Sequence, residues 1–382
     1  MELEGRLLID GRFTPGRITL EGGRIRAIAA LPLDRTLSNL PIVAPGLIDL
    51  HIHGYGGADP IEQLPLMALA LARHGTTAFQ PTLFPAAPEV LGPLCERAWS
   101  AAKALGPGLA TAVGLHLEGP FVNRERAGAL PPEDLAEPSL AGLRAILGPA
   151  TGDGRGVRTV TLAPELPGSA DLIAELVRCG VRVSLGHSKA TADDARRATR
   201  AGAQGATHLF NAMNSVHHRE VGLAGLALLE RALTAEIIGD LVHVGADAVE
   251  LALAARGPGG LALVSDALRG AGTGCDVFHS HGRAHVIRDG TAYYPPEGAR
   301  TELQLAGTAM GQLDMVRRLV QRGVVGVEDA LTMASTTPAR ALGLEREFGV
   351  LSVGARADLI VLQGRELALQ RVLVGGVDVD LS

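Results

Sequence analysis

Histidine and carboxylate side chains occur in several segments of this chain in patterns that suit metal binding. The segment "GLIDLHIHGYGG", residues 46–57, carries two histidines one residue apart in an otherwise apolar run. Because side chains alternate along a strand, His51 and His53 would point to one face and Ile52 to the other. Two convergent imidazole nitrogens can bind one ion. A histidine in an apolar strand is, however, more often a hydrogen-bonded core residue. Whether these two histidines bind a metal therefore depends on further ligands elsewhere in the chain.

Those other candidates follow the ends of later apolar segments. They are His116 and Glu118 in "GLHLEG", His187 in "SLGHS", His208 in "THLFNAM" and Asp266 in "LVSDA". Imidazole nitrogens and carboxylate oxygens suit zinc or iron, and three protein ligands with one open position are typical of a catalytic site. Each residue alone is equally well explained as a helix cap or a buried hydrogen-bonding group. Their joint placement at strand ends favours a metal held by Glu118, His187 and His208.

Asp266 has a different expected task. A carboxylate beside a metal-bound water can take its proton, leave hydroxide as the nucleophile, and return the proton to a leaving amine. The alternative is a helix N-cap, which the glycines of "SDALRGAG" disfavour. His116 shares a strand face with Glu118, so we expect it either to support a ligand from behind or to belong to the core.

A barrel would bring these distant segments together. β-Branched and apolar segments alternate with alanine-rich helical segments, of which the clearest has Thr191 as its N-cap and stops at Gly202. This alternation predicts a TIM-like (β/α)8 barrel, an α/β fold whose catalytic groups lie at the C-terminal ends of the strands. The expected strands are 47–53, 76–83, 112–118, 158–164, 181–187, 205–210, 235–240 and 261–266.

Both ends of the chain are rich in short strand patterns instead. Residues 1–44 and 340–382 are therefore expected to pair into one small, discontinuous β-sandwich domain. It would lie beside a catalytic barrel that spans residues 45–339.

Composition excludes several classes of protein. The 382 residues carry a formal net charge of -6, which argues against general nucleic-acid binding. Three distant cysteines without a CxxC pair suggest neither a disulfide framework nor a thiolate zinc cluster. No apolar run approaches the ~20 residues needed to span a bilayer. We expect a soluble, cytoplasmic protein with reduced thiols and no membrane partner.

Eight motifs together resemble the N-acetylglucosamine-6-phosphate deacetylases of the amidohydrolase superfamily. They are "PGLIDLHIHG", "GLHLEGPFVN", "SLGHSKAT", "THLFNAM", "HHRE", "VSDA", "LAGTAM" and "GARADLIVL". The resemblance runs nearly end to end, and "HLEGPF" and "THLFNAM" are its most specific parts. It implies a hydrolase with an amidohydrolase-type barrel. The reaction would convert N-acetyl-D-glucosamine 6-phosphate to D-glucosamine 6-phosphate and acetate by attack of hydroxide on a divalent metal, Zn²⁺ or Fe²⁺.

The resemblance also implies roles for individual residues. Glu118, His187 and His208 would bind the principal metal, and Asp266 would be the general base and acid. The intact His51 and His53 leave room for a second ion, so one or two metals per subunit are expected. The implied substrate-binding residues are Ala129, Asn211, Ala212, Arg219, His243, Leu305, Ala306 and Gly307. In a homodimer, Arg219 would reach the phosphate in the neighbouring site, although by itself it suggests only a solvated loop charge.

Some positions depart from the family pattern. Leu130 stands where relatives often have His or Gln, "SVHHRE" lacks a usual proline, and residues 274–300 match only as a hairpin-like stretch. A preference for N-acetylgalactosamine 6-phosphate therefore stays open. Cyclic amidases and deaminases with a carbamylated lysine are disfavoured because "RTVTLAPE" has no lysine. A catalytically dead scaffold is disfavoured because every expected ligand is present.

Overall fold

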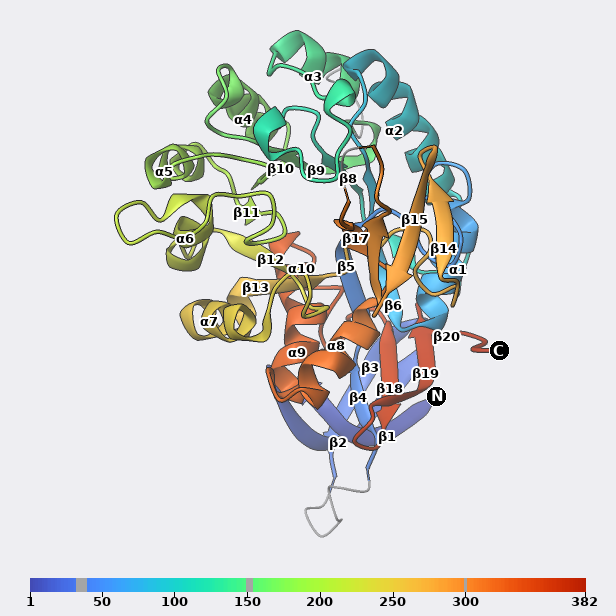
Figure 1. Ribbon diagram of the computed structural model, residues 1–382. Helices are drawn as coiled ribbons and strands as arrows, with labels where there is room; N and C mark the ends of the chain where they lie inside the picture. The colour runs from blue at the N-terminus through green and yellow to red at the C-terminus, as the bar shows by residue number, and fades with distance from the viewer. Residues whose placement is uncertain (32–39, 149–153, 299–300) are drawn as a thin grey trace.

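Eight parallel strands form a nearly closed barrel in the computed structural model, which describes residues 1–31, 40–148, 154–298 and 301–382 (Figure 1). Successive strands are neighbours in the sheet, as a repeated strand-helix unit requires. The short strand β7 (Thr111–Ala112) pairs with β6 outside this path. The barrel strands are β5 (Leu47–Ile52), β6 (Thr76–Leu83), β8 (Leu115–Glu118), β9 (Val157–Leu162), β10 (Arg182–Leu185), β11 (Gly205–Ala206), β12 (Thr234–Ile238) and β13 (Leu261–Val264). The predicted barrel is confirmed.

The barrel closes where the last strand meets the first. The backbone N–H of Asp266 donates to the carbonyl of His51 at 2.8 Å, and that of His53 donates to the carbonyl of Ala267 at 2.9 Å. Both bonds lie just beyond the C-terminal end of β13. The closing seam therefore runs through candidate metal ligands.

Helices cover the outside of the barrel (Figure 1). The predicted cap of α5 is present, because Thr191 Oγ1 accepts the N–H of Asp194 and the Asp194 carboxylate accepts the N–H of Thr191. None of the helices in the described ranges is long and apolar enough to cross a membrane. The helices are α1 (Leu64–Arg73), α2 (Pro88–Lys103), α3 (Leu140–Leu147), α4 (Ser169–Arg178), α5 (Ala192–Arg200), α6 (Gly222–Leu229), α7 (Ala246–Arg256), α8 (Gln312–Gln321), α9 (Val327–Ala334) and α10 (Thr336–Ala341).

The two chain ends join in one mixed sheet. Strand β4 makes the connection, since it pairs parallel with β1 and antiparallel with β18. Leu7, Ile18 and Leu359 belong to its buried core. The strands, in sheet order, are β20 (Val377–Asp378), β19 (Ala368–Val374), β18 (Leu359–Gln363), β4 (Ile42–Pro45), β1 (Glu2–Ile9), β2 (Arg12–Glu21) and β3 (Arg24–Ala30). The expected union of both ends is present, although hydrogen bonds connect these strands in one continuous sheet where a sandwich has two.

A third sheet follows β13, in the region where the sequence indicated only a hairpin. Its antiparallel strands are β14 (Val277–Ser280), β15 (Arg283–Arg288), β16 (Thr291–Tyr294) and β17 (Gln304–Thr308), which we call the mouth sheet. Strand β17 rejoins the barrel, because the N–H of Thr308 donates to the carbonyl of Asp266 at 2.9 Å. The mouth sheet is thus attached to the end of the barrel at which the candidate ligands lie.

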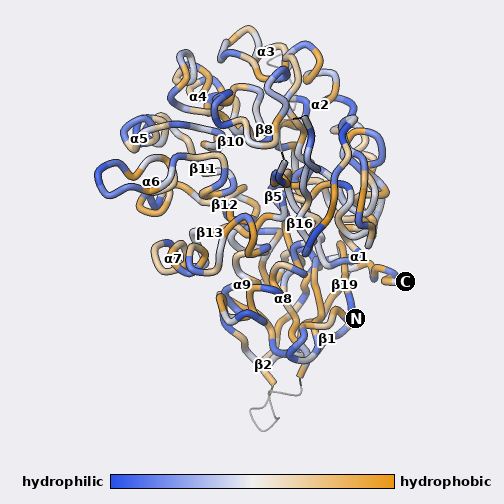
Figure 2. The backbone as a smooth tube through the Cα atoms, in the orientation of Figure 1, coloured by the Kyte–Doolittle hydropathy of each residue, from blue (hydrophilic) through white to orange (hydrophobic). Residues whose placement is uncertain are grey.

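Polar side chains fill the barrel interior beneath that end. Apolar alternate residues such as Val160 and Leu185 are buried, while Thr161, Ser184 and Thr207 form a hydrogen-bonded chain. Figure 2 shows hydropathy along the same trace, with strongly hydrophilic segments in outer loops such as the one before α6. Because a buried polar group without a partner is costly, this connected interior is suited to support charged residues above it.

Candidate active site

Each candidate ligand lies at or just beyond the C-terminal end of its strand. Glu118 is the last residue of β8, whereas His187, His208 and Asp266 each stand two residues past a strand end. These last three have φ angles of 47°, 32° and 48°, in the left-handed region that residues other than glycine seldom adopt. Such backbone conformations cluster at functional sites, because the surrounding structure must hold them. The left-handed turns direct the three side chains toward a common point.

Glu118, His187 and His208 form the first triad. Glu118 Oε1 lies 2.9 Å from His187 Nε2 and 3.0 Å from His208 Nε2, and the two nitrogens are 3.0 Å apart. Ligands of one tetrahedral zinc are separated by roughly 3.3 Å, given bonds of about 2.0–2.1 Å. His187 Nδ1 donates to the carbonyl of Arg126 at 2.8 Å, which leaves Nε2 with its lone pair facing the site. The three donors therefore fit one metal ion.

His51, His53 and Asp266 form the second triad. The Nε2 atoms of the two histidines are 3.3 Å apart, and each lies 3.6 Å from Asp266 Oδ1. Glu118 stands between the triads, with Oε1 3.4 Å from His51 Nε2 and Oε2 3.1 Å from His53 Nε2. His51 Nδ1 lies 3.2 Å from Glu236 Oε2, an arrangement that presents Nε2 to the site. The six residues fit one ion or two.

The charges in this buried cluster depend on one another. Burial by itself would raise the pKa of Glu118, but the neighbouring His51 and His187, with hydrogen bonds from His187 and His208, lower it well below its usual range. Glu118 is therefore a carboxylate.

His116 belongs to the core and is no ligand. Its ring nitrogens contact Thr82 Oγ1 at 3.2 Å and Thr161 Oγ1 at 2.8 Å, and its ring lies 4.6 Å from that of His51. Burial lowers the pKa of His116 well below its usual value, so the ring is neutral. It supports His51 by packing.

A cavity of about 450 Å³ opens beside both triads. All the predicted substrate residues except Arg219 line it, together with Leu130, the position at which the sequence departs from its relatives. Strand β17 of the mouth sheet supplies one wall. The lining residues are His53, Phe84, Glu118, Gly128, Ala129, Leu130, His187, His208, Asn211, Ala212, His243, Asp266, Leu303, Gln304, Leu305, Ala306 and Gly307.

Arg219 lies elsewhere. It is exposed on the loop before α6, where its Nη1 contacts His218 Nε2 at 2.8 Å. The cavity of its own chain contains no contribution from this side chain.

Two buried carboxylates behind the site were missed from the sequence. They are Glu236, described above, and Asp240. The Asp240 carboxylate accepts from His243 Nδ1 at 2.7 Å and from Thr291 Oγ1 of the mouth sheet at 3.0 Å. Burial opposes ionisation of both partners, but their hydrogen bond and mutual charge lower the pKa of Asp240 and raise that of His243. The segment "AEIIGD" could have indicated both residues, because acidic side chains in an apolar strand need hydrogen-bonding or charged partners when they are buried.

Phe84 was also missed. Its ring stacks on that of His53 with centroids 3.9 Å apart, and it lines the cavity. An aromatic residue directly after an apolar strand is common, so nothing in the local pattern indicated this role for Phe84.

Comparison with known proteins agrees with this geometry. The model of the amidohydrolase family matches residues 42–379. The chain is 38% identical to the human N-acetylglucosamine-6-phosphate deacetylase over 350 residues, which cover 88% of this chain and 82% of that protein. It is 31% identical to an N-acetylgalactosamine-6-phosphate deacetylase of Escherichia coli O157:H7, over 97% of both chains.

A solved structure shares the whole architecture. It is a mutant N-acetyl-D-glucosamine-6-phosphate deacetylase of Mycobacterium smegmatis in complex with N-acetyl-D-glucosamine-6-phosphate, with a TM-score of 0.88, 31% identity and 99% coverage of both chains. The family model and these relatives agree with the barrel architecture. The chain therefore belongs to the amidohydrolase family, in the branch of the N-acetylglucosamine-6-phosphate deacetylases.

Proposed function

We propose that this protein hydrolyses the acetamide of N-acetyl-D-glucosamine 6-phosphate to D-glucosamine 6-phosphate and acetate. One observation carries the proposal: two adjoining histidine-carboxylate triads, with Glu118 between them, border a cavity of a size suited to a small molecule. The relationship to the human enzyme, and to the mycobacterial enzyme in complex with this sugar phosphate, supports the choice of substrate.

The metal would be held by the residues of the two triads. Glu118, His187 and His208 would bind the principal ion, while His51 and His53 would bind a second one. A donor set of imidazoles and carboxylates without thiolates suits zinc or iron. When bound, the metal supplies Lewis-acid polarisation of the acetamide carbonyl and activates water.

Asp266 is the proposed general base and acid. Its side chain is 16% exposed and lines the cavity, whereas Glu118 is only 4% exposed, so Asp266 is the carboxylate that solvent and substrate can reach. Oδ1 would accept a proton from the attacking water and deliver it to the amide nitrogen as the C–N bond breaks. A free amine can leave only after it receives that proton.

The remaining cavity residues would orient the sugar. Asn211, Ala212 and His243 would face the polar groups of the sugar, and Ala129 and Leu305–Gly307 would line the cavity beside the ring. Arg219 would reach the phosphate of a neighbouring subunit in a homodimer, since it is exposed and does not line the cavity of its own chain. A guanidinium suits this task because it pairs with phosphate through two N–H groups.

Acetate release from a small substrate panel tests the proposal. N-acetylglucosamine 6-phosphate should be hydrolysed faster than unphosphorylated N-acetylglucosamine. N-acetylgalactosamine 6-phosphate is the second candidate, because the chain matches a deacetylase of that sugar over 97% of its length and Leu130 departs from the family pattern inside the cavity. Release of acetate from neither phosphorylated sugar by the metal-loaded protein would refute the proposal.

A reducing compartment such as the cytoplasm is the proposed location. All three cysteines, Cys95, Cys179 and Cys275, are free thiols. Disulfides would be expected in a chain adapted to an oxidising compartment.

A further inference from the structure

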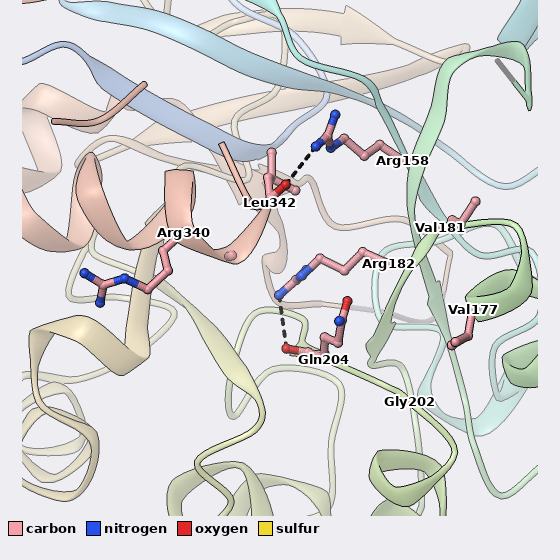
Figure 3. Close-up of a pocket in the computed structure, with 11 residues that line it drawn as sticks. Arg158, Val177, Val181, Arg182, Gly202, Gln204, Arg340 and Leu342 are labelled. Atoms are coloured by element: carbon pink, nitrogen blue, oxygen red, sulfur yellow. Dashed lines mark hydrogen bonds between the residues drawn. The ribbon is translucent and has the colours of Figure 1, made fainter. Parts of the chain in front are cut away.

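A second cavity lies at the opposite, N-terminal end of the barrel strands (Figure 3). It has a volume of about 350 Å³ and lies between the beginnings of β9 and β10 and the end of α10. Three of the eleven residues that line it are arginines, and none is acidic. They are Arg158, Val177, Gly180, Val181, Arg182, Gly202, Gln204, Arg340, Ala341, Leu342 and Gly343. We call this the arginine cavity.

Arg182 is buried there with most of its donors unused. Its side chain is 5% exposed, and Nε and Nη1 have no hydrogen-bond partner among the described residues. Nη2 reaches only the carbonyl of Gln204, at the long distance of 3.5 Å. Glu236 Oε1 faces Arg182 from the barrel interior, but at 3.9 Å from Nη1 it is too far for a hydrogen bond. A buried guanidinium with free N–H groups is costly unless something satisfies them.

Arg158 adds a second cation from the adjacent strand. It is partly buried, and its Nη2 donates to the carbonyl of Leu342 at 2.7 Å. Within the described ranges, no carboxylate lies within ion-pair distance of Arg158 or Arg340. Figure 3 shows Arg158 and Arg182 extending from neighbouring strands toward the end of α10. The guanidinium groups of Arg158 and Arg182 against the single carboxylate of Glu236 make the cavity electropositive.

The walls leave room for a ligand. A Cβ atom added to Gly180 or Gly343 would meet nothing within 4 Å, so both face open space. The volume lies at the lower end of the range for small-molecule sites, about 300–1,000 Å³. A phosphate group with a small attached residue would fit.

We propose that the arginine cavity binds the phosphate group of a small metabolite. Arginine suits this ligand because its planar fork of N–H donors matches the oxygens of a tetrahedral oxyanion. Bound oxygens would accept N–H bonds from Arg158 and would offset the buried positive charge of Arg182 beside it. The site lies at the other end of the barrel from the proposed active site, and its existence does not depend on the proposed reaction.

Crystals of the metal-loaded protein soaked in tungstate, a tetrahedral oxyanion with a strong anomalous signal, test the proposal. An anomalous peak is expected between Arg158 and Arg182, separate from any peak in the catalytic cavity. Inorganic phosphate should displace it. Displacement by glucose 6-phosphate as well would identify a sugar phosphate as ligand, whereas displacement by inorganic phosphate alone would identify free phosphate. Absence of a peak in the arginine cavity would overturn the proposal.

A second test measures the affinity of matched variants for inorganic phosphate in solution. The Arg219→Gln background removes the proposed phosphate contact of the active site. In that background, Arg158→Gln should weaken phosphate binding about tenfold or more, the usual effect of losing one charge-assisted contact. Arg365→Gln, an exposed arginine in the turn between β18 and β19, should leave binding unchanged. Equal affinities in the Arg158 and Arg365 variants would contradict the proposal.

The tungstate soak covers the case in which Arg158→Gln fails to fold, because it uses the parent protein alone.

Discussion

The imidazoles of the site are fixed by groups behind them. Glu236 holds Nδ1 of His51, and the carbonyl of Arg126 holds Nδ1 of His187. Each contact fixes the tautomer and directs Nε2 toward the metal position. Asp240 does the same for His243 on the substrate side of the cavity. At the scale of single residues, the geometry of the site therefore depends on acceptors that do not themselves line the cavity.

Replacement of Asp266 by asparagine tests its role as proton carrier. Asn keeps the size of the side chain but cannot accept and return a proton. The turnover number should fall by ~10² or more, while metal analysis should still find the ion of the first triad. Near-normal acetate release by Asp266→Asn would contradict the assignment.

Replacement of Asp240 by asparagine should change how substrate binding depends on pH. Burial lowers the pKa of His243, but its hydrogen bond and ion pair with Asp240 outweigh burial and raise that pKa. A protonated His243 would attract the anionic substrate, so KM should be low below this pKa and rise as pH passes through it. Without the Asp240 charge the pKa falls, and the rise in KM should begin at lower pH.

The control for this change is Asp247→Asn, an exposed aspartate at the start of α7. Its pH profile of KM should match that of the unmodified protein. A profile of Asp240→Asn that is superimposable on the control would show that His243 does not act through its charge.

At the scale of elements, the mouth sheet contacts both the proposed sugar wall and the proposed base. Strand β17 supplies Leu305–Gly307 to the cavity wall, and the next residue, Thr308, hydrogen-bonds the carbonyl of Asp266. Strand β16 supplies Thr291 to Asp240. Movement of this sheet would therefore disturb both the sugar wall and the proposed base.

Substitution of Gly307 should reveal this connection. Gly307 has a φ of 141°, and a Cβ atom there would lie 3.0 Å from the carbonyl oxygen of Asp266. Gly307→Ala should therefore shift Asp266 and lower kcat by ~10- to 100-fold, as small misplacements of catalytic groups do. Gly282→Ala in the same sheet has no atom within 4 Å of the added Cβ and should retain kcat. Similar kcat values for the two variants would contradict the proposed connection.

For the whole molecule, the proposed metal ligands lie on both sides of the barrel closure. His51 and His53 come from the first barrel strand and its end, Asp266 follows the last strand, and backbone bonds of 2.8 and 2.9 Å join the two at the seam. Glu118, His187 and His208 come from three further positions around the same rim. Bound metal would cross-link segments that are far apart in the chain.

Removal of metal should therefore lower stability as well as activity. An ion that binds only the folded state stabilises it by about 2.7 kcal/mol at one hundred times its Kd. Dialysis against a chelator should abolish acetate release and lower Tm by several degrees, and added zinc should restore both. The untreated protein should contain about one to two equivalents of zinc or iron. Full activity of metal-free protein would refute the metal-dependent reaction.

The sequence predicted best those elements that depend on contacts between residues close together in the chain. The strand expected at 76–83 is observed as β6, because its pattern is local. The strand expected at 112–118 is divided into β7 and β8, and those at 181–187 and 205–210 are short, because left-handed turns at the ligands end the pairing early. The sequence did not predict the mouth sheet as a sheet. Its four strands are recognised only from their pairing with one another and not from a local pattern of residues.

The sequence by itself determined the types of ligand, their positions at the ends of strands, and the barrel that brings the strand ends to one rim. The reason is that strand alternation and helical periodicity are patterns among neighbouring residues. Only the tertiary structure decided that Glu118 stands between the two triads, that Glu236 and Asp240 hold histidines from behind, and that arginines gather at the opposite end of the barrel. These relationships join residues up to 185 positions apart, as His51 and Glu236 are. Distances across a closed barrel follow from the packing of the whole chain, to which no local pattern gives access.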